Sequence, residues 1–253
     1  MTIAKHAPTR IFHVKESRPL SVNPDIDPQI YAPILQKNKR LQIQNFLDKE
    51  SATQIHSLLT SNKKWYLSYN EPGGFFETPL EEFIALSPVQ RSRFIQNIYQ
   101  RARNNFQFMF NHYYISQAIN NGEDKGHPLH AVHEFVNTAK FLDFMRTLTG
   151  EQSINDADSF ASQYAPGHFL TKHDDIHDQD DRVAAYVISM NPVWQESWGG
   201  HLAFYDSIGN IEDAFIPSFN TLNIFLIPQS HAVQMVSPFA GAARNSLLGW
   251  LRR

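Results

Sequence analysis

The first 150 residues carry the spacing of amphipathic helices. Ser87-Pro88-Val89-Gln90 predicts a helix start, because it supplies a cap hydroxyl, a proline at the first helical position and a glutamine at the third. Apolar side chains then recur every four residues and predict core packing, at Phe94, Ile98, Ala102, Phe106 and Phe110. A second long helix is predicted from about Pro128 to Thr149, where Gly150 ends it.

After Gly150 the pattern changes to short runs rich in Val, Ile, Phe and Tyr, separated by turn residues. The eight runs are SFASQY, HFLTKH, RVAAYVISM, HLAFY, AFIP, TLNIFLIP, HAVQMV and RNSLLGWL. They predict an α+β protein whose core is a double-stranded β-helix, or jelly roll, or a small barrel. No strand is expected between the two long helices, so both are predicted to buttress one face of one sheet.

The chain divides into an N-terminal arm and one domain. Residues 1–39 carry prolines with little periodicity and are predicted to be extended. Residues 40–253 are predicted to form a single jelly-roll domain, with helical support over 40–150 and the core barrel over 151–253. The support begins with a strand from Arg40, a helix capped by Asp48, and a strand over Lys64–Tyr69.

Composition narrows the chemistry. The 253 residues include 22 Lys+Arg and 25 Asp+Glu, a formal charge of −3, which favours neither nucleic acid nor an anionic membrane as partner. No run approaches the roughly 18 apolar residues of a membrane span, and the start lacks the apolar core of a secretory signal, so a cytoplasmic protein is expected. There is no cysteine but there are 12 histidines, so any metal must have nitrogen and oxygen ligands.

Three residues form a candidate metal site. Side chains alternate along a strand, so His173 and Asp175 point the same way at the end of HFLTKH. His231 begins a later strand and supplies a third ligand. Two histidines and one carboxylate form the facial triad of non-haem Fe(II) oxygenases. A pair of His173 with His177 would instead suit a helix, which the preceding strand pattern disfavours.

A cation near this site would anchor an acidic co-substrate. By alternation Arg244, Ser246, Leu248 and Trp250 share one face of the last strand. A guanidinium beside a hydroxyl makes a bidentate clamp for a carboxylate. An inward Arg244 implies a bound acid, because burying it without an anion costs several kcal/mol. The alternative is an exposed arginine on a terminal strand.

These motifs occur in an order that resembles a known family. The series comprises Tyr-Ala-Pro-Gly at 164–167, His-Asp-Asp at 173–175, Gly-Gly-His-Leu at 199–202, His231, and Arg-Asn-Ser-Leu-Leu-Gly-Trp at 244–250. It is similar to the Fe(II)/2-oxoglutarate dioxygenases of the prolyl-hydroxylase type, and looks closest to the ribosomal-protein prolyl hydroxylases and their bacterial relatives.

The resemblance implies a role for each matching residue. His173, Asp175 and His231 match the catalytic iron ligands, and Arg244 matches the residue that binds the distal carboxylate of 2-oxoglutarate. Tyr164 matches a tyrosine that helps hold this carboxylate, and Ser246 fits an accessory hydroxyl. O2 is the second co-substrate, and ascorbate is a further candidate. The presence of Asp175 argues for hydroxylation, because the related halogenases lack this carboxylate.

The function expected from the resemblance is hydroxylation of an unactivated C–H bond of a prolyl residue, with release of succinate and CO2. The substrate is a protein, a peptide or a small molecule, and a free amino acid or metabolite stays an alternative. Two other classes are a non-catalytic jelly-roll binding module and a cupin-type metal enzyme, although the His-x-His motif with a following glutamate that is usual in cupins is missing. No oligomeric state is predicted.

The remaining aromatic and titratable residues are expected to have lesser roles. Trp194, Trp198 and Tyr205 are expected either to contact substrate at a rim of the site or to pack in the core. The other histidines are expected on the surface or in ordinary packing: His6, His13, His56, His112, His127, His130 and His133, with His168, His177 and His201 nearer the site. The acidic run Asp178, Asp180 and Asp181 is expected to form a solvated turn.

Overall fold

The architecture is defined by one antiparallel sheet, which this computed structural model describes for residues 18–176 and 181–253. Its main path runs β1-β11-β8-β13-β6-β4-β7-β12-β9-β10. Off this path, β2 pairs with β4, β3 pairs with β2, and β5 pairs with β13. The strands are β1 (Arg40–Gln44), β2 (Tyr66–Glu71), β3 (Gly74–Pro79), β4 (Phe108–Tyr113), β5 (Asp156–Ala157), β6 (Phe160–Tyr164), β7 (Phe169–His173), β8 (Arg182–Ser189), β9 (Leu202–Tyr205), β10 (Ile211–Phe215), β11 (Thr221–Leu226), β12 (His231–Val233) and β13 (Arg244–Arg252).

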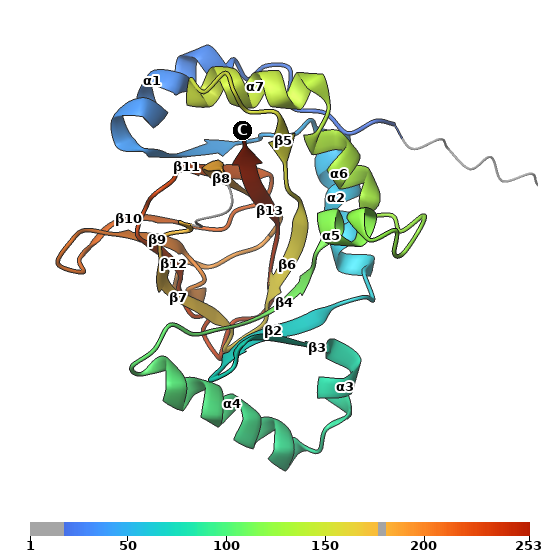
Figure 1. The fold of residues 1–253 in the computed structure, drawn as a ribbon, viewed down its shortest axis with the longest axis vertical. Helices are drawn as coiled ribbons and strands as arrows, with labels where there is room; N and C mark the ends of the chain where they lie inside the picture. The colour runs from blue at the N-terminus through green and yellow to red at the C-terminus, as the bar shows by residue number, and fades with distance from the viewer. Residues whose placement is uncertain (1–17, 177–180) are drawn as a thin grey trace, which may run out of the picture.

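Helices cover the outside of this sheet on several sides (Figure 1). They are α1 (Pro28–Asn38), α2 (Lys49–Ser61), α3 (Leu80–Ala85), α4 (Pro88–Ala102), α5 (Ile115–Asn120), α6 (His130–Val136) and α7 (Ala139–Thr149), with a short 3-10 turn at Glu196–Trp198. Within the described part of the chain, no helix is long and apolar enough to cross a membrane.

The sheet curls into a nearly closed barrel of the jelly-roll type, so the predicted fold class is confirmed. All eight strands predicted after Gly150 are present, as β6 to β13. Inside the barrel, side chains of facing strands meet, as Phe204 of β9 does with Phe225 of β11, whose ring centroids lie 5.3 Å apart. Apolar contacts between the two inner faces therefore hold the barrel together from within.

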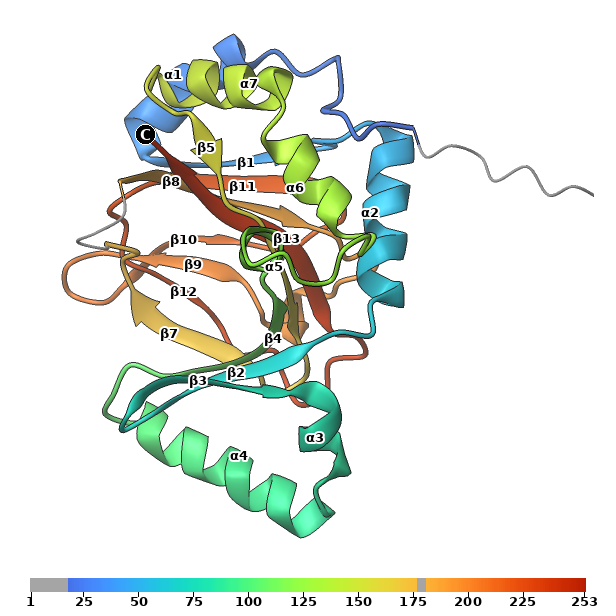
Figure 2. The same cartoon turned by 45° about the vertical axis from the view of Figure 1, so that its right-hand side comes forward.

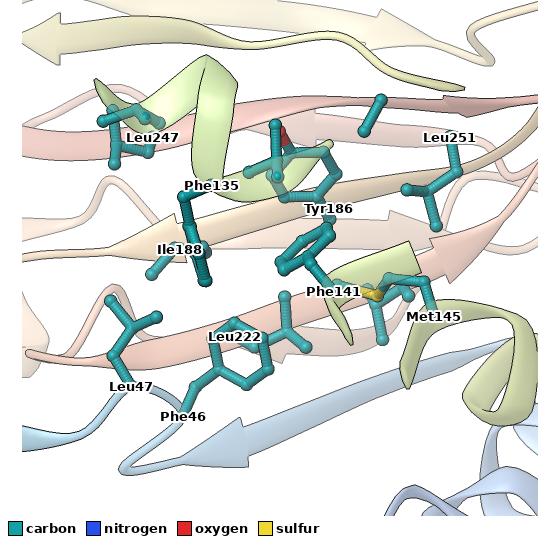
Figure 3. Packing of buried hydrophobic residues seen from close by; sticks show 14 of the residues in the cluster. Phe46, Leu47, Phe135, Phe141, Met145, Tyr186, Ile188, Leu222, Leu247 and Leu251 are labelled. Atoms are coloured by element: carbon teal, nitrogen blue, oxygen red, sulfur yellow. The ribbon is translucent and has the colours of Figure 1, made fainter. Parts of the chain in front are cut away.

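The largest apolar core lies outside the barrel, between the helices and the strands β8, β11 and β13. Figure 3 shows Phe141 and Met145 of α7 packed over Tyr186 of β8. The ring of Phe141 meets that of Tyr186 edge-on, with centroids 5.8 Å apart. Helices α2 and α6 extend this cover along one flank (Figure 2). Together these helices bury the outer apolar face of β8, β11 and β13.

The helix predicted over residues 128–149 is in fact two helices. Thr138 separates α6 from α7, and its hydroxyl accepts a hydrogen bond from the backbone N–H of Phe141, which makes it a new N-cap. Gly150 ends α7 in the left-handed conformation, with φ of 74°, as expected. The prediction of one continuous helix was wrong because apolar spacing continues across a break that a capping side chain creates.

The capping box at Ser87 and Gln90 is confirmed, but the helix α4 ends at Ala102. Phe106 lies beyond it and Phe110 belongs to β4, which pairs with β2, β6 and β7. The helical stripe predicted through Phe110 was therefore wrong, as was the absence of a strand between the long helices. Helix α4 packs under β2, β4 and β7, away from α7, so the two helices do not share one sheet face (Figure 1).

The extended arm predicted over residues 1–39 was wrong for residues 28–38, which form α1. Pro28 occupies the first turn, and the Asp27 carboxylate accepts a hydrogen bond from the N–H of Gln29. Prolines thus start a helix here instead of excluding one. Residues 1–17 lie outside the described part of the chain, and the single domain over 40–253 stays a prediction.

Arg40 joins the two ends of the main sheet path. Its guanidinium on β1 donates to Glu212 and Asp213 of β10, at 3.1 Å and 3.2 Å. It also lies over the ring of Phe204, 5.0 Å from the centroid. The seam of the barrel is therefore closed by charge where backbone pairing stops.

We expect Arg40→Met to lower the free energy of unfolding by about 1 kcal/mol, because it removes three charge-assisted hydrogen bonds, to Asp213, Gln229 and Glu212, from a half-buried seam. Denaturant unfolding measures the change. Arg18→Met is the matched control, since the Arg18–Glu50 pair is exposed and 3.8 Å apart, and it should leave the stability unchanged. An equal loss in both variants would contradict a specific role for the seam.

Candidate metal centre

Two histidines from neighbouring strands face each other inside the barrel. The pairing of β12 with β7 sets His231 directly opposite His173, and the two ring centroids lie 4.1 Å apart. His231 is buried, and His173 is mostly so. The register of this strand pair, and not proximity in the sequence, therefore brings the two imidazoles together.

Asp175 completes the cluster from just beyond β7. Its backbone is in the left-handed region, with φ of 62°, which turns the chain so that the carboxylate returns toward the histidines. Asp175 Oδ1 lies 3.4 Å from His173 Nε2, and Oδ2 lies 3.5 Å from His231 Nε2. One ligand atom from each residue lies within 4.8 Å of the others. Two nitrogens and one oxygen at these separations fit the facial triad of an Fe(II) site.

Backbone carbonyls orient both imidazoles. His173 Nδ1 donates to the carbonyl of Thr171 at 3.0 Å, and His231 Nδ1 donates to the carbonyl of Gln229 at 2.8 Å. A carbonyl can only accept, so Nδ1 carries the proton in each ring. In the neutral rings Nε2 keeps its lone pair and points at the shared centre. The rings are thus held in the tautomer that a metal requires.

Burial also favours the protonation states of metal ligands. It lowers the pKa of His231 to about 4, helped by the neighbouring His173, so His231 is neutral near pH 7. Burial raises the pKa of the Asp175 carboxyl, but contacts with the two histidines and with Trp250 outweigh it and leave that pKa below its ordinary value. The cluster therefore offers the neutral imidazole of His231 and the carboxylate of Asp175 to a metal.

Arg244 lies inward in the same barrel, as its strand position predicts. It is only 2% exposed, and its Nε has no hydrogen-bond partner. Among the described residues no carboxylate forms an ion pair with it; its guanidinium lies over the ring of Tyr164, 5.3 Å from the centroid. Burial lowers the pKa of Arg244, although Tyr164 opposes this. A buried cation without an anion fits the distal carboxylate of 2-oxoglutarate.

Tyr164 and Ser246 flank Arg244 differently. Tyr164 is the cross-strand neighbour of Arg244 and lines the cavity, stacked on Phe110 with ring centroids 4.9 Å apart. Ser246 is fully buried and its hydroxyl has no partner, but it does not line the cavity. Its cross-strand neighbour Ser162 does line the cavity, and its hydroxyl also lacks a partner.

All these groups except Ser246 open into one cavity of about 200 Å³. Its polar lining consists of the His-Asp-His cluster, Arg244, Tyr164, Ser162 and a few aromatic edges, and the other walls are apolar. Phe75 and Phe106 lie at its mouth, 50% and 45% exposed. The cavity lining is completed by Phe108, Phe110, Tyr114, Phe160, Leu170, Ala185, Val187, Leu202, Phe225, Val233, Leu248, Gly249 and Trp250.

The tryptophans of the 191–200 loop do not form a rim of this cavity. Trp194 packs on the apolar cluster beneath Arg244, and its indole N–H donates to the carbonyl of Gly199. Trp198 contacts Trp194 edge-on, and Tyr205 lines a separate groove on the outside of the barrel. The structure therefore favours packing for Trp194 and Trp198, and places Tyr205 outside the cavity.

The other histidines near the site take no part in the cluster. His168 is buried, which lowers its pKa to about 4, and His201 lies close enough to Arg244 for the cation to lower its pKa further after burial. Neither lines the cavity. His177, Asp178 and Asp180 lie outside the described residues.

Sequence reasoning missed Ser162 and the phenylalanines of β4. The position of Ser162 in the cavity becomes apparent only from the pairing of β6 with β13, which sets it opposite Ser246. Phe110 was assigned to a helical stripe, and Phe108 was given no role. The alternation within Phe108–Tyr113 was the available signal, since Phe108 and Phe110 share a face.

Comparison with known proteins agrees with this geometry. Residues 159–252 match the model of the 2OG-Fe(II) oxygenase superfamily. No curated protein is similar to the chain in sequence.

Three solved structures show the same fold at low sequence identity. A Pseudomonas putida prolyl-4-hydroxylase is 18% identical, with 89% of this chain and 98% of that chain covered and a TM-score of 0.54. A 2OG-Fe(II) oxygenase family oxidoreductase from Burkholderia pseudomallei is 14% identical, with 90% and 92% covered and a TM-score of 0.58. A Trichoplax adhaerens prolyl hydroxylase, in complex with a peptide fragment of hypoxia inducible factor, is 16% identical, with 89% and 88% covered and a TM-score of 0.59.

The barrel has the jelly-roll fold of 2OG-Fe(II) oxygenases, and its His-Asp-His cluster could hold the metal that such enzymes require. The superfamily match over residues 159–252 agrees with the predicted resemblance to Fe(II)/2-oxoglutarate dioxygenases. This superfamily implies Fe(II), 2-oxoglutarate and O2, for which the donor set and the orphaned guanidinium are suited.

We expect Asp175→Ala to weaken Fe(II) binding by at least about 100-fold, since loss of a ligand should cost more than loss of its supporting contacts. Anaerobic dialysis against Fe(II), followed by metal analysis, measures the affinity. Asp174→Ala is the matched control, because that side chain is exposed and is not part of the His-Asp-His cluster. Equal affinities for the two variants would show that Asp175 is not a ligand.

Proposed function

We propose that the protein hydroxylates an unactivated C–H bond of a prolyl residue in a protein or peptide, using Fe(II), 2-oxoglutarate and O2 and releasing succinate and CO2. The observation that carries this proposal is the juxtaposition, in one cavity, of the His-Asp-His cluster and an uncompensated Arg244. A location in the cytoplasm stays a prediction.

Each part of the site would have a distinct task. His173, Asp175 and His231 would hold Fe(II) by one face and leave its other positions open. Arg244 and the Tyr164 hydroxyl would bind the distal carboxylate of 2-oxoglutarate and so orient its keto acid toward the metal. Bound Fe(II), with its co-substrates, supplies the oxidising chemistry.

The cavity wall would exclude water and position the substrate. Apart from the hydroxyls of Tyr114 and Tyr164 and the indole N–H of Trp250, the phenylalanine, tyrosine and tryptophan side chains of the described lining offer no hydrogen-bonding group. An apolar enclosure of this kind strengthens the polar contacts inside it and keeps the reacting C–H bond away from solvent. A proline ring, which is apolar and compact, suits such walls.

The same lining bears on the choice between a prolyl residue and a free amino acid. A free amino acid would bring an ammonium and a carboxylate into the cavity. Arg244 is the one guanidinium among the described lining residues, and it is needed to bind 2-oxoglutarate, so the carboxylate of the amino acid would have no cationic partner. The only carboxylate among the described lining residues is Asp175, which belongs to the metal cluster. A proline within a peptide chain carries neither charge, so the wall supports a peptide substrate.

A non-catalytic binding module is the other class to weigh. A jelly roll that served only as an interaction surface would have no need for a complete ligand set or for a buried, unpaired guanidinium. Both are costly to retain, because an uncompensated buried charge destabilises the fold by several kcal/mol. Their joint presence supports catalysis.

The proposal is tested first by binding and then by turnover. Anaerobic addition of Fe(II) and 2-oxoglutarate should produce a weak visible charge-transfer band. In air, with proline-containing peptides, the protein should form succinate and a product heavier by 16 Da. Peptides left unmodified while free proline gains 16 Da would move the assignment to a small-molecule hydroxylase. Fully metallated protein that shows neither the band nor succinate would refute the oxygenase.

We expect Arg244→Met to raise the KM for 2-oxoglutarate by about 100-fold, equivalent to about 2.7 kcal/mol of lost charge-assisted binding. The variant should be at least as stable as the wild type, because methionine replaces an unpaired buried cation with an apolar chain. Succinate assays at varied 2-oxoglutarate and denaturant unfolding measure the two effects. Arg103→Met, at an exposed position outside the cavity, is the control. An unchanged KM would exclude Arg244 as the anchor.

A further inference from the structure

A second, polar pocket adjoins the candidate active site along β4. Phe108, Phe110 and His112 alternate on one face of this strand, and the first two line the main cavity. His112 lines the second pocket, of about 60 Å³, and Tyr114 lines both. Two residues of a strand span about 7 Å, so the two pockets are close enough for neighbouring residues of one extended peptide.

Hydrogen-bond acceptors dominate this second pocket. Its charged lining comprises three carboxylates, Glu77, Glu123 and Asp124, and one ammonium, Lys64. Lys64 Nζ is engaged by both oxygens of Asp124, at 2.6 Å and 2.7 Å. Glu77 and Glu123 are therefore left without a cationic lysine or arginine partner among the described residues. The pocket carries an excess of negative charge.

His112 is the second observation that points to a ligand. Its ring is only 1% exposed, its Nε2 lies 3.1 Å from Glu77 Oε2, and neither ring nitrogen has a hydrogen-bond partner of good geometry in the described part of the chain. A carboxylate can only accept, so attraction between the two groups requires a proton on Nε2, and an Nδ1 that carries no proton is then an unused acceptor. A buried acceptor without a donor is costly, and a donor from outside would satisfy it.

The complementary group is a compact cation with several N–H donors. A guanidinium or an ammonium can donate at once to Glu77 and to His112 Nδ1, whereas a carboxylate or an apolar side chain can satisfy neither. The side chain of Glu77 is 40% exposed, so such a group can reach it from solvent. Phe75 lies two residues before Glu77 on β3. It lines the main cavity, and its ring centroid lies 6.3 Å from that of His112, which lines the second pocket.

We propose that this pocket binds a basic side chain, arginine or lysine, that flanks the target residue in a peptide substrate. The inference rests on the proposed function for its orientation, because the main cavity takes the prolyl residue and the second pocket takes its basic neighbour. It names the substrate class more closely: a proline in a basic stretch of protein. Glu77 and His112 are the specificity-determining residues.

The experiment measures binding separately from turnover. Blocked peptides carry one proline and one arginine at each offset from −4 to +4, and each has a twin with citrulline, which keeps the shape of arginine but not its charge. Calorimetry on anaerobic protein loaded with Fe(II) and 2-oxoglutarate gives the Kd of every peptide. At one offset, or two adjacent ones, arginine should bind about tenfold more tightly than citrulline.

Variants locate the effect in the pocket. Glu77→Gln should reduce the preference for arginine to less than about twofold, and Glu123→Gln should reduce it in part. Glu82→Gln, an exposed carboxylate on α3 outside the pocket, should keep the full preference. If Glu77→Gln fails to fold, as judged by circular dichroism, Glu123→Gln decides.

The contrary outcomes are distinct. Equal Kd values for arginine and citrulline at every offset, no binding by any arginine peptide, or a preference that survives both pocket variants would overturn the inference. Exposure of the same complexes to air tests the proposed function by itself. Peptides that bind with the arginine preference but never gain 16 Da would refute prolyl hydroxylation and leave the basic-residue pocket standing.

Discussion

The pairing of β12 with both of its neighbours is the contact on which the rest of the molecule depends. This strand has three residues, yet it is the link between β7 and β9 in the sheet path. His231 lies opposite His173 on one side and opposite Phe204 on the other. The same backbone hydrogen bonds therefore hold the barrel wall together and set the spacing of the candidate ligands. Slippage by one residue would turn His231 out of the cavity.

Buried charge is concentrated in one part of the fold. The helices make the outside of the barrel wall apolar, and the inside holds one cation, one carboxylate and two imidazoles among aromatic rings. Such groups lower the stability of the empty protein, because water no longer solvates them. Binding of a metal cation to the His-Asp-His cluster and of an anion to the arginine would offset this desolvation cost and stabilise the folded protein. The apolar core between the helices and the sheet must therefore contribute enough free energy of folding to compensate for the buried charges of the site.

Much of the barrel and its candidate site is visible in the sequence, because strand alternation and the order of motifs are local properties. All eight C-terminal strands, the capped start of α4 and the inward face of Arg244 follow from such patterns. The predictions that were wrong concern features that depend on tertiary contacts. The break at Thr138 and the strand at Phe108–Tyr113 look helical by spacing alone. Ser162 and His112 acquire meaning only from the strands beside them.

The hairpin of β2 and β3 has a consequence beyond substrate access. Strand β3 pairs only with β2 among the described strands, and its Phe75 and Phe76 are 50% and 43% exposed. An unpaired strand edge beside exposed aromatic rings is a template on which a second chain can add a strand. Self-association should therefore begin at this hairpin when the protein is concentrated. A peptide that occupies the mouth of the cavity would cover the ring of Phe75 and so reduce this self-association.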